Sequence, residues 1–286
     1  MQIVGYETER AASAGESARG DRHGANDRST GDDRRGASDE EGAGDRYRRA
    51  AVLLADDEGV RRERLDPGRE LGYSLGGRRC AGALDGTTHY DCANEAAPYC
   101  DQHTRTWVCA RCTGTCLKDE MDCYDDHAIY LAAFAPATFK VGVTKAWRLS
   151  TRLREQGADR AALLRTVENG RIAREIESQL ADEFTDRVRV PEKISGLHRS
   201  VDEAAWHDAL AEFDPAETFD FDYGLDLSTK PVGETLAAGE VVGVQGRVLV
   251  LARGGTTYAV DLRNLVGYEV GNDESGRQLQ SSLGAF

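Results

Sequence analysis

The chain has 286 residues, and 40% of them are hydrophobic. A chain of this length and composition can bury a sizeable core and is not wholly disordered. No apolar run approaches the roughly 18 residues that a membrane-spanning helix needs. The first residues, MQIVGYETER, lack the basic and apolar regions of a signal peptide, so we expect a cytoplasmic protein with no membrane partner.

Acidic residues dominate the charge, because 50 Asp and Glu against 36 Lys and Arg give a formal net charge of −14. Of the basic residues, 31 are Arg and 5 are Lys. One interpretation is a protein that repels nucleic acid and acidic membranes. The other is adaptation to molar salt, where the screening length is about 3 Å. The acidic residues are spread along the chain, so we favour a halophilic protein whose local charge decides its partners.

Residues 1–79 are predicted to form N-terminal β-strands that an acidic insertion interrupts. Residues 2–6 alternate like a short strand. Between Tyr6 and Val52 the sequence has no Val, Ile, Leu, Met, Phe or Trp, so residues 8–48 cannot bury enough apolar surface to fold. We therefore predict disorder over 8–48 and ordered structure again at 51–54.

Residues 80–127 contain all seven cysteines. Their spacing forms two sets of four ligands, each with a C-x2-C or C-x2-H turn that suits tetrahedral zinc. The sets are Cys80, Cys92, Cys100 and His103, then Cys109, Cys112, Cys116 and Cys123. An odd number of cysteines in a reducing compartment disfavours disulfides, so we predict two structural zinc ions.

Other interpretations of the cysteines stay open. A full set of four ligands leaves no open coordination position, which disfavours catalytic zinc. His127 could replace one ligand of the second set. An iron–sulfur cluster on the all-cysteine set, or free buried thiols, are the remaining alternatives.

Residues 128–215 are predicted to form a small α/β domain with three strands and three helices. In chain order these are strand 129–134, strand 138–143, helix 146–156, strand 161–167, helix 171–184 and a helix from a capping box at 200–203 to about residue 213.

Residues 216–286 are predicted to be a linker followed by a β meander over 240–270. Apolar residues alternate along its strands, and Gly254-Gly255 suits a hairpin turn. The N-terminal strands lack a partner sheet of their own and are candidates to join the meander. The whole pattern predicts an α+β fold: a zinc-ribbon-like region, a three-stranded antiparallel sheet with helices, and the meander.

The segment from residue 129 to residue 180 resembles the GIY-YIG nuclease superfamily, in the branch whose second strand reads K-[IV]-G. Ile129-Tyr130 matches the end of the first motif, and Lys140-Val141-Gly142 matches the second. Arg152 is the best match to the arginine on the helix that follows. Ala173-x3-Glu177-x2-Leu180 matches the helix that presents a metal-binding glutamate.

The resemblance implies a small GIY-YIG-like α/β sandwich and a metal-dependent endonuclease. Glu177 would bind one Mg²⁺ or Mn²⁺, and Arg152 would stabilise charge on the phosphate. Tyr130, or less favourably Lys140, would activate or orient water. Gly142 would let the backbone approach a neighbour closely.

The chain also resembles the uncharacterised family known as domain of unknown function 2797. That likeness covers residues 80–190 well, and its most specific stretch is Glu155-Gln156-Gly157-Ala158.

Local charge agrees with an anionic partner. Residues 140–174 contain nine basic and three acidic residues, a basic segment inside an acidic chain. We expect nucleic acid, either DNA or RNA, to contact Lys145, Arg148, Arg154 and Arg160.

Each of these residues has a plainer interpretation. The arginines and Glu155 on the helix 146–156 could form surface ion pairs, Glu177 could be an exposed charge, and Tyr130 could be a core aromatic. Trp107, Trp147 and Trp206 are predicted to be packing residues. Three hypotheses follow: a metal-dependent nuclease, a catalytically inactive zinc-ribbon nucleic-acid-binding protein, and a protein-interaction scaffold.

Overall fold

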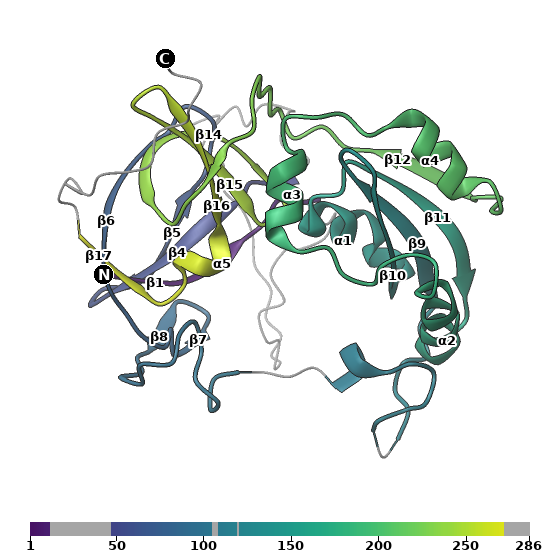
Figure 1. Cartoon of the computed structure of the whole chain (residues 1–286). Helices are drawn as coiled ribbons and strands as arrows, with labels where there is room; N and C mark the ends of the chain where they lie inside the picture. Colours follow the sequence, from purple (N-terminus) through teal and green to yellow (C-terminus); the bar gives the residue numbers. More distant parts are fainter. Residues whose placement is uncertain (12–46, 105–107, 119, 272–286) are drawn as a thin grey trace, which may run out of the picture.

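A computed structural model describes residues 1–11, 47–104, 108–118 and 120–271 (Figure 1). Most of the predicted insertion, residues 12–46, lies outside the described residues. At its borders, β2 (Arg10–Ala11) pairs with β3 (Tyr47–Arg48). This pairing lies inside the predicted insertion, and the disorder of the rest of it stays a prediction.

The larger of two main sheets has nine strands, in the order β13-β16-β15-β14-β6-β17-β1-β4-β5. They are β1 (Gln2–Glu7), β4 (Ala51–Asp56), β5 (Gly59–Arg64), β6 (Glu70–Arg78), β13 (Val232–Gly233), β14 (Ala237–Gln245), β15 (Val248–Arg253), β16 (Thr256–Asp261) and β17 (Tyr268–Gly271). The short helix α5 (Leu262–Leu265) follows β16. The main core of this sheet contains fully buried side chains, among them Leu54, Leu249, Leu251 and Val260.

The first and the last described strands pair in this sheet, because β1 is antiparallel to both β17 and β4. This confirms that the N-terminal strands join the C-terminal meander. The predicted hairpin also forms: Arg253 pairs with Thr256 across Gly254 and Gly255, both of which have positive φ. Since only glycine adopts two such residues in a row easily, the sequence signal for this turn is strong.

The smaller sheet has four antiparallel strands, in the order β10-β9-β11-β12. They are β9 (His127–Phe134), β10 (Thr138–Lys145), β11 (Arg160–Val167) and β12 (Glu217–Asp220). The first three were expected, and β12 is an addition. Its four residues carry two acidic side chains, so it lacks the apolar alternation that identifies a strand.

Helices cover both faces of the smaller sheet. They are η2 (Ala146–Arg148), α1 (Leu149–Gln156), α2 (Gly170–Leu180), α3 (Val190–Gly196) and α4 (Glu203–Leu210). Side chains alternate along β9, so Tyr130 packs with Leu153 of α1, whereas Leu131 packs with Ala173 of α2 and Trp206 of α4. Thus α1 lies on one face, and α2 and α4 lie on the other.

The start of α4 differs from the sequence prediction, and the end of α1 explains a glycine in the sequence. Helix α4 begins at Asp202, whose side chain accepts a hydrogen bond from the Ala205 amide, so the predicted capping box at Ser200 is wrong. Helix α1 ends at Gly157, which has φ +69°. Gln245 of the larger sheet donates a hydrogen bond to the Gly157 carbonyl (3.0 Å), so this turn joins the two sheets.

The segment between the two sheets contains a small hairpin, β7 (Ala83–Asp85) with β8 (Thr88–Tyr90), and the short helix η1 (Val108–Arg111). In the described part of the chain, no helix is both long and apolar enough to cross a bilayer.

Candidate metal centre

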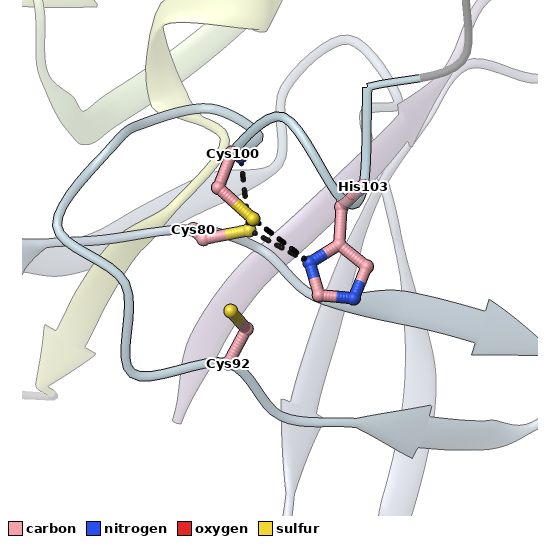
Figure 2. A group of neighbouring side chains, drawn as sticks. All are labelled: Cys80, Cys92, Cys100 and His103. Atoms are coloured by element: carbon pink, nitrogen blue, oxygen red, sulfur yellow. Dashed lines mark hydrogen bonds between the residues drawn. The ribbon is translucent and has the colours of Figure 1, made fainter.

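The first predicted ligand set is assembled. The ligand atoms of Cys80, Cys92, Cys100 and His103 all lie within 4.8 Å of one another (Figure 2). Nδ1 of His103 lies 3.3 Å from the sulfur of Cys80 and 3.3 Å from that of Cys100. Three sulfurs and one imidazole nitrogen at this spacing suit a tetrahedral zinc ion.

The acid–base properties of these thiols also suit a cation. Burial raises the pKa of the Cys100 thiol, but hydrogen bonds from the His103 and Gln102 amides outweigh it and bring the pKa to about 7. The Asn94 amide lowers the pKa of Cys92, yet desolvation and the neighbouring sulfurs of Cys80 and Cys100 raise it overall. The two shifts have opposite directions, and a bound zinc ion would favour the thiolate form of its cysteine ligands.

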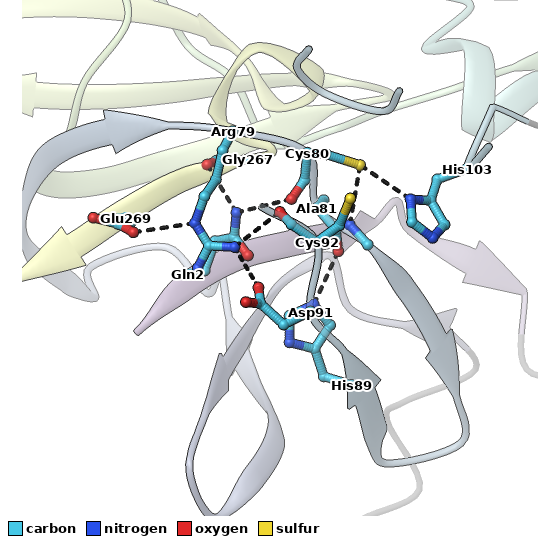
Figure 3. A network of polar contacts seen from close by, with 11 residues as sticks. Gln2, Arg79, Cys80, Ala81, His89, Asp91, Cys92, His103, Gly267 and Glu269 are labelled. Atoms are coloured by element: carbon cyan, nitrogen blue, oxygen red, sulfur yellow. Dashed lines mark hydrogen bonds and ion pairs between the residues drawn. The ribbon is translucent and has the colours of Figure 1, made fainter. Parts of the chain in front are cut away.

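The larger sheet holds this ligand loop in place through a polar network (Figure 3). Gln2 on β1 donates hydrogen bonds to the carbonyls of Cys80 (3.3 Å) and Gly267 (3.0 Å). The guanidinium of Arg79 donates to the Cys92 carbonyl (3.0 Å) and pairs with Asp91 and Glu269. The centre is thus attached to β1 and to the segment around β17, which favours a structural metal.

Sequence reasoning missed Gln2 and Arg79, because they lie far from the ligands in the sequence or carry no ligand chemistry of their own. The C-x2-H turn itself is well formed: the Cys100 carbonyl accepts hydrogen bonds from the amides of His103 (2.9 Å) and Thr104 (2.8 Å).

The second predicted ligand set is not assembled. Among the described residues, only the first set brings three or more such donors within 4.8 Å. The Cys112 amide donates to the Cys109 carbonyl (3.2 Å), which forms the expected tight turn. Cys123 lies beside the start of α2, where its carbonyl accepts from the Gly170 amide (2.8 Å). A second zinc stays a prediction.

His127, the alternative ligand of the second set, lies close to Cys123. Its Nδ1 lies 2.7 Å from the Asp125 carbonyl oxygen, and the tautomer with its proton on Nδ1 would present Nε2 as the ligand atom. A Cβ on Gly170 would lie 2.9 Å from that Nε2 and 3.0 Å from the Cβ of Cys123, so the two candidate ligands are neighbours.

Tyr130 is a core residue. It is 1% exposed, and its hydroxyl accepts a hydrogen bond from the Gln156 side chain (2.5 Å). A Cβ on Gly142 would lie 2.5 Å from that hydroxyl, so Gly142 permits a close approach to Tyr130. A hydroxyl enclosed in this way is poorly placed to activate water for a substrate.

The other three candidate catalytic residues are divided between the two faces of the smaller sheet. Lys140 lies with its Nζ 5.9 Å from the Tyr130 ring centroid, on the α1 face. Arg152 of α1 pairs with Glu155 (3.4 Å). Glu177 belongs to α2, on the opposite face, and pairs with Arg174 (2.6 Å). The structure therefore does not bring Arg152 and Glu177 together.

A magnesium or manganese site at Glu177 lacks supporting ligands. Within the described residues, no group of three or more His, Cys, Asp or Glu donors includes Glu177. Its carboxylate is instead bonded to a guanidinium, which competes with a metal ion for the same oxygen atoms.

The predicted nucleic-acid contacts all form ion pairs within the chain. Lys145 pairs with Asp125 (2.5 Å), Arg148 with Glu155 (3.1 Å), and Arg154 with Glu9 (3.4 Å). Arg160 pairs with Glu203 (2.6 Å) and Asp220 (2.7 Å). Four of these acidic partners lie outside the segment, so they offset part of its excess positive charge: Glu9, Asp125, Glu203 and Asp220.

The tryptophans differ from one another. Trp206 is 6% exposed and packs with Phe139 at 5.9 Å between ring centroids, as predicted. Trp147 is 75% exposed, so its prediction as a packing residue is wrong. It lies in η2, where the chain turns from β10 to α1 and its side chain meets no core. Trp107 lies outside the described residues.

Comparison with known proteins identifies one family. The family model described as Protein of unknown function (DUF2797) matches residues 68–270. No curated protein and no solved structure matches the chain. The likeness to GIY-YIG nucleases thus rests on the motif residues alone.

Proposed function

Because the chain belongs to the DUF2797 family, whose function is unknown, we propose its function from the site itself: a zinc-stabilised nucleic-acid-binding protein without GIY-YIG catalysis. The observation that carries the proposal is the exposure of Trp147 beside the guanidinium of Arg148, two residues after Lys145. A bare indole flanked by cations is the arrangement on which unpaired bases stack while phosphates are neutralised.

The surface around Trp147 has the required composition. Arg148 lies with its guanidinium carbon 5.9 Å from the Trp147 ring centroid, and Lys145 is two residues away at the end of β10. Tyr124 is 70% exposed, and its segment is held nearby, since the Asp126 carbonyl accepts from the Ala146 amide (2.8 Å). We call Tyr124, Lys145, Trp147 and Arg148 the aromatic surface.

The ion pairs of these cations do not exclude phosphate. Lys145 and Arg148 are both partly exposed, at 45% and 41%, and exposed ion pairs contribute only about 0–1 kcal/mol. A phosphate can therefore replace the carboxylate partner at low cost. The same reasoning predicts that binding weakens steeply with salt.

Zinc has a structural part in this proposal. Cys80, Cys92, Cys100 and His103 would fill all four positions of a tetrahedral ion and leave none for substrate. The nuclease hypothesis is less favoured because it needs Arg152 and Glu177 on one surface, and they lie on helices that cover opposite faces.

Binding of fluorescently labelled single-stranded 12-mers of DNA and RNA tests the proposal, measured across a series of KCl concentrations. Stacking contributes about 1–3 kcal/mol per base, so Trp147→Ala should weaken binding roughly 5- to 150-fold. The matched control is Tyr90→Ala, which removes another exposed aromatic, 56% exposed, on the hairpin β7–β8. Equal affinities of the Trp147 variant and the wild type would contradict the proposal.

The same samples decide between the alternatives. Cleavage with Mg²⁺ that is lost in Glu177→Gln would favour the nuclease. Failure of the wild type to bind either nucleic acid at any salt would favour the scaffold.

A further inference from the structure

A pocket of about 400 Å³ lies where the two sheets meet, apart from the metal centre and from the aromatic surface. Four parts of the chain line it. Tyr6 and Thr8 come from the end of β1 and just beyond, and Arg152 and Gln156 come from α1. Lys193 comes from α3, and Arg247 from the turn between β14 and β15. The volume is that of pockets that hold small organic ligands.

Positive charge converges on this pocket. Arg152, Lys193 and Arg247 line it, and Glu155 is the one acidic residue among its lining residues. Arg247 is held by Asp261 (2.8 Å), and Arg152 by Glu155 (3.4 Å). Both guanidiniums are partly exposed, so they are fixed in place while still able to contact a ligand.

Lys193 has no counter-ion among the residues that the structure describes. Its Nζ donates to the Gln156 carbonyl (2.5 Å) and lies 4.4 Å from the Phe134 ring centroid. Within the described part of the chain, no carboxylate forms an ion pair with it. Burial, then the neighbouring charges of Lys140, Arg247 and Arg152, lower the pKa of Lys193 to about 7, against a weaker opposing effect of Asp159.

We propose that this pocket binds a phosphate group carried by a nucleotide-sized molecule. The guanidiniums of Arg152 and Arg247 and the ammonium of Lys193 would contact its oxygens, since forked guanidinium contacts suit tetrahedral oxyanions. The hydroxyls of Tyr6 and Thr8 supply further donors at the same wall. An anion here offsets the repulsion among the three cations, which is the electrostatic reason for the pocket to be occupied.

Binding should be coupled to protonation of Lys193. The charged groups that face it are Lys140 from β10, Arg152 and Glu155 from α1, Asp159 before β11, and Arg247. An anion favours the charged form of Lys193, so affinity should be full below pH 7 and fall as the pH rises above it. Sulfate is the suitable probe, because its charge does not change over this range.

Titration calorimetry with sulfate, inorganic phosphate and AMP tests the proposal at constant KCl concentration. The wild type should bind all three, AMP most tightly, and sulfate at least fivefold more weakly at pH 8.5 than at pH 6. Lys193→Met should weaken phosphate binding at least tenfold. Lys230→Met, the same substitution at an exposed lysine outside the pocket lining, should not.

A second variant distinguishes loss of the binding site from misfolding of the Lys193→Met protein. Lys193→Arg keeps the charge, so it should still bind sulfate but lose the pH dependence. Two comparisons then identify the source of the phosphate: AMP against adenosine, and a 5′-phosphorylated against an unphosphorylated oligonucleotide. Preference for either phosphorylated form supports the proposal.

No heat with any of the anions, unchanged binding in Lys193→Met, or an unchanged pH profile in Lys193→Arg would overturn it. Trp147→Ala should leave sulfate binding intact, so failure of the aromatic surface and failure of this pocket are distinguishable.

Discussion

The two cysteine sets each contain one tight C-x2-H or C-x2-C turn, but their surroundings differ. Cys80, Cys92, Cys100 and His103 lie against the nine-stranded sheet, where Gln2 and Arg79 hold the backbone of two ligands. The second set lies on a separate loop that contacts the start of α2, where Arg171 donates a hydrogen bond to the Gly114 carbonyl (3.0 Å). Spacing therefore predicts ligand chemistry, whereas the surrounding fold decides which ligands already converge.

The largest expected effect is a difference in thermal stability between variants of the first and the second cysteine set. Cys100→Ser should remove one zinc ion and lower the Tm on the order of 10 °C. The reason is that a lost structural metal costs several kcal/mol, and each kcal/mol shifts Tm by about 2–4 °C in a chain of this size. Cys112→Ser should lower Tm far less. Metal content by mass spectrometry and thermal unfolding measure both; equal losses of Tm would remove the contrast.

The two cysteine sets should also differ in the rate at which they release zinc to a chelator. In excess EDTA, a preorganised and partly buried site should release zinc more slowly than an exposed loop, so the native mass should pass through a form with one zinc. The Cys112→Ser protein identifies which ion remains. Loss of both ions in a single step would show that the two loops are equally labile.

A smaller effect is expected from the support of the first set. Arg79→Ala removes the donor to the Cys92 carbonyl and two ion pairs, so it should weaken zinc binding about 10-fold, at the low end of the effects of such outer contacts. Arg111→Ala, an exposed arginine beside the second set, is the control. Zinc competition with a coloured chelator measures the affinity, and equal affinities in the two variants would contradict the supporting role.

The smallest effect tests the second set. Gly170→Ala would place a Cβ 2.9 Å from Nε2 of His127 and force that ring to move by a few tenths of an ångström. We expect a severalfold loss of affinity for the second zinc alone. Gly233→Ala, where a Cβ meets nothing within 4 Å, is the matched control. An unchanged second zinc would exclude His127 and Cys123 as its ligands.

Local patterns predicted much of the fold. The alternation in β9, β10 and β11 and the spacing in α1 and α2 are signals carried by neighbouring residues, and they were placed within a few residues. The first zinc set follows from spacing alone. In contrast, β12 and the start of α4 depend on contacts that the local pattern does not carry.

Three-dimensional proximity explains what the sequence could not supply. Lys193 and Arg247 are 54 residues apart, by their numbers, and belong to no shared motif, yet they line one pocket with Arg152. The exposure of Trp147 depends on where β10 ends relative to α1. The opposite orientation of Arg152 and Glu177 follows from which face each helix covers, which periodicity does not fix.

The most specific stretch of the family likeness, Glu155-Gln156-Gly157-Ala158, has a consequence beyond its helix. A Cβ on Gly157 would meet the Gln245 backbone at 3.0 Å, and one on Gly246 would meet the Gly157 nitrogen at 2.5 Å. Two glycines therefore let two layers of the molecule touch backbone to backbone. Invariance of this stretch among relatives would report on the joining of two sheets, and by itself it would be no sign of shared chemistry.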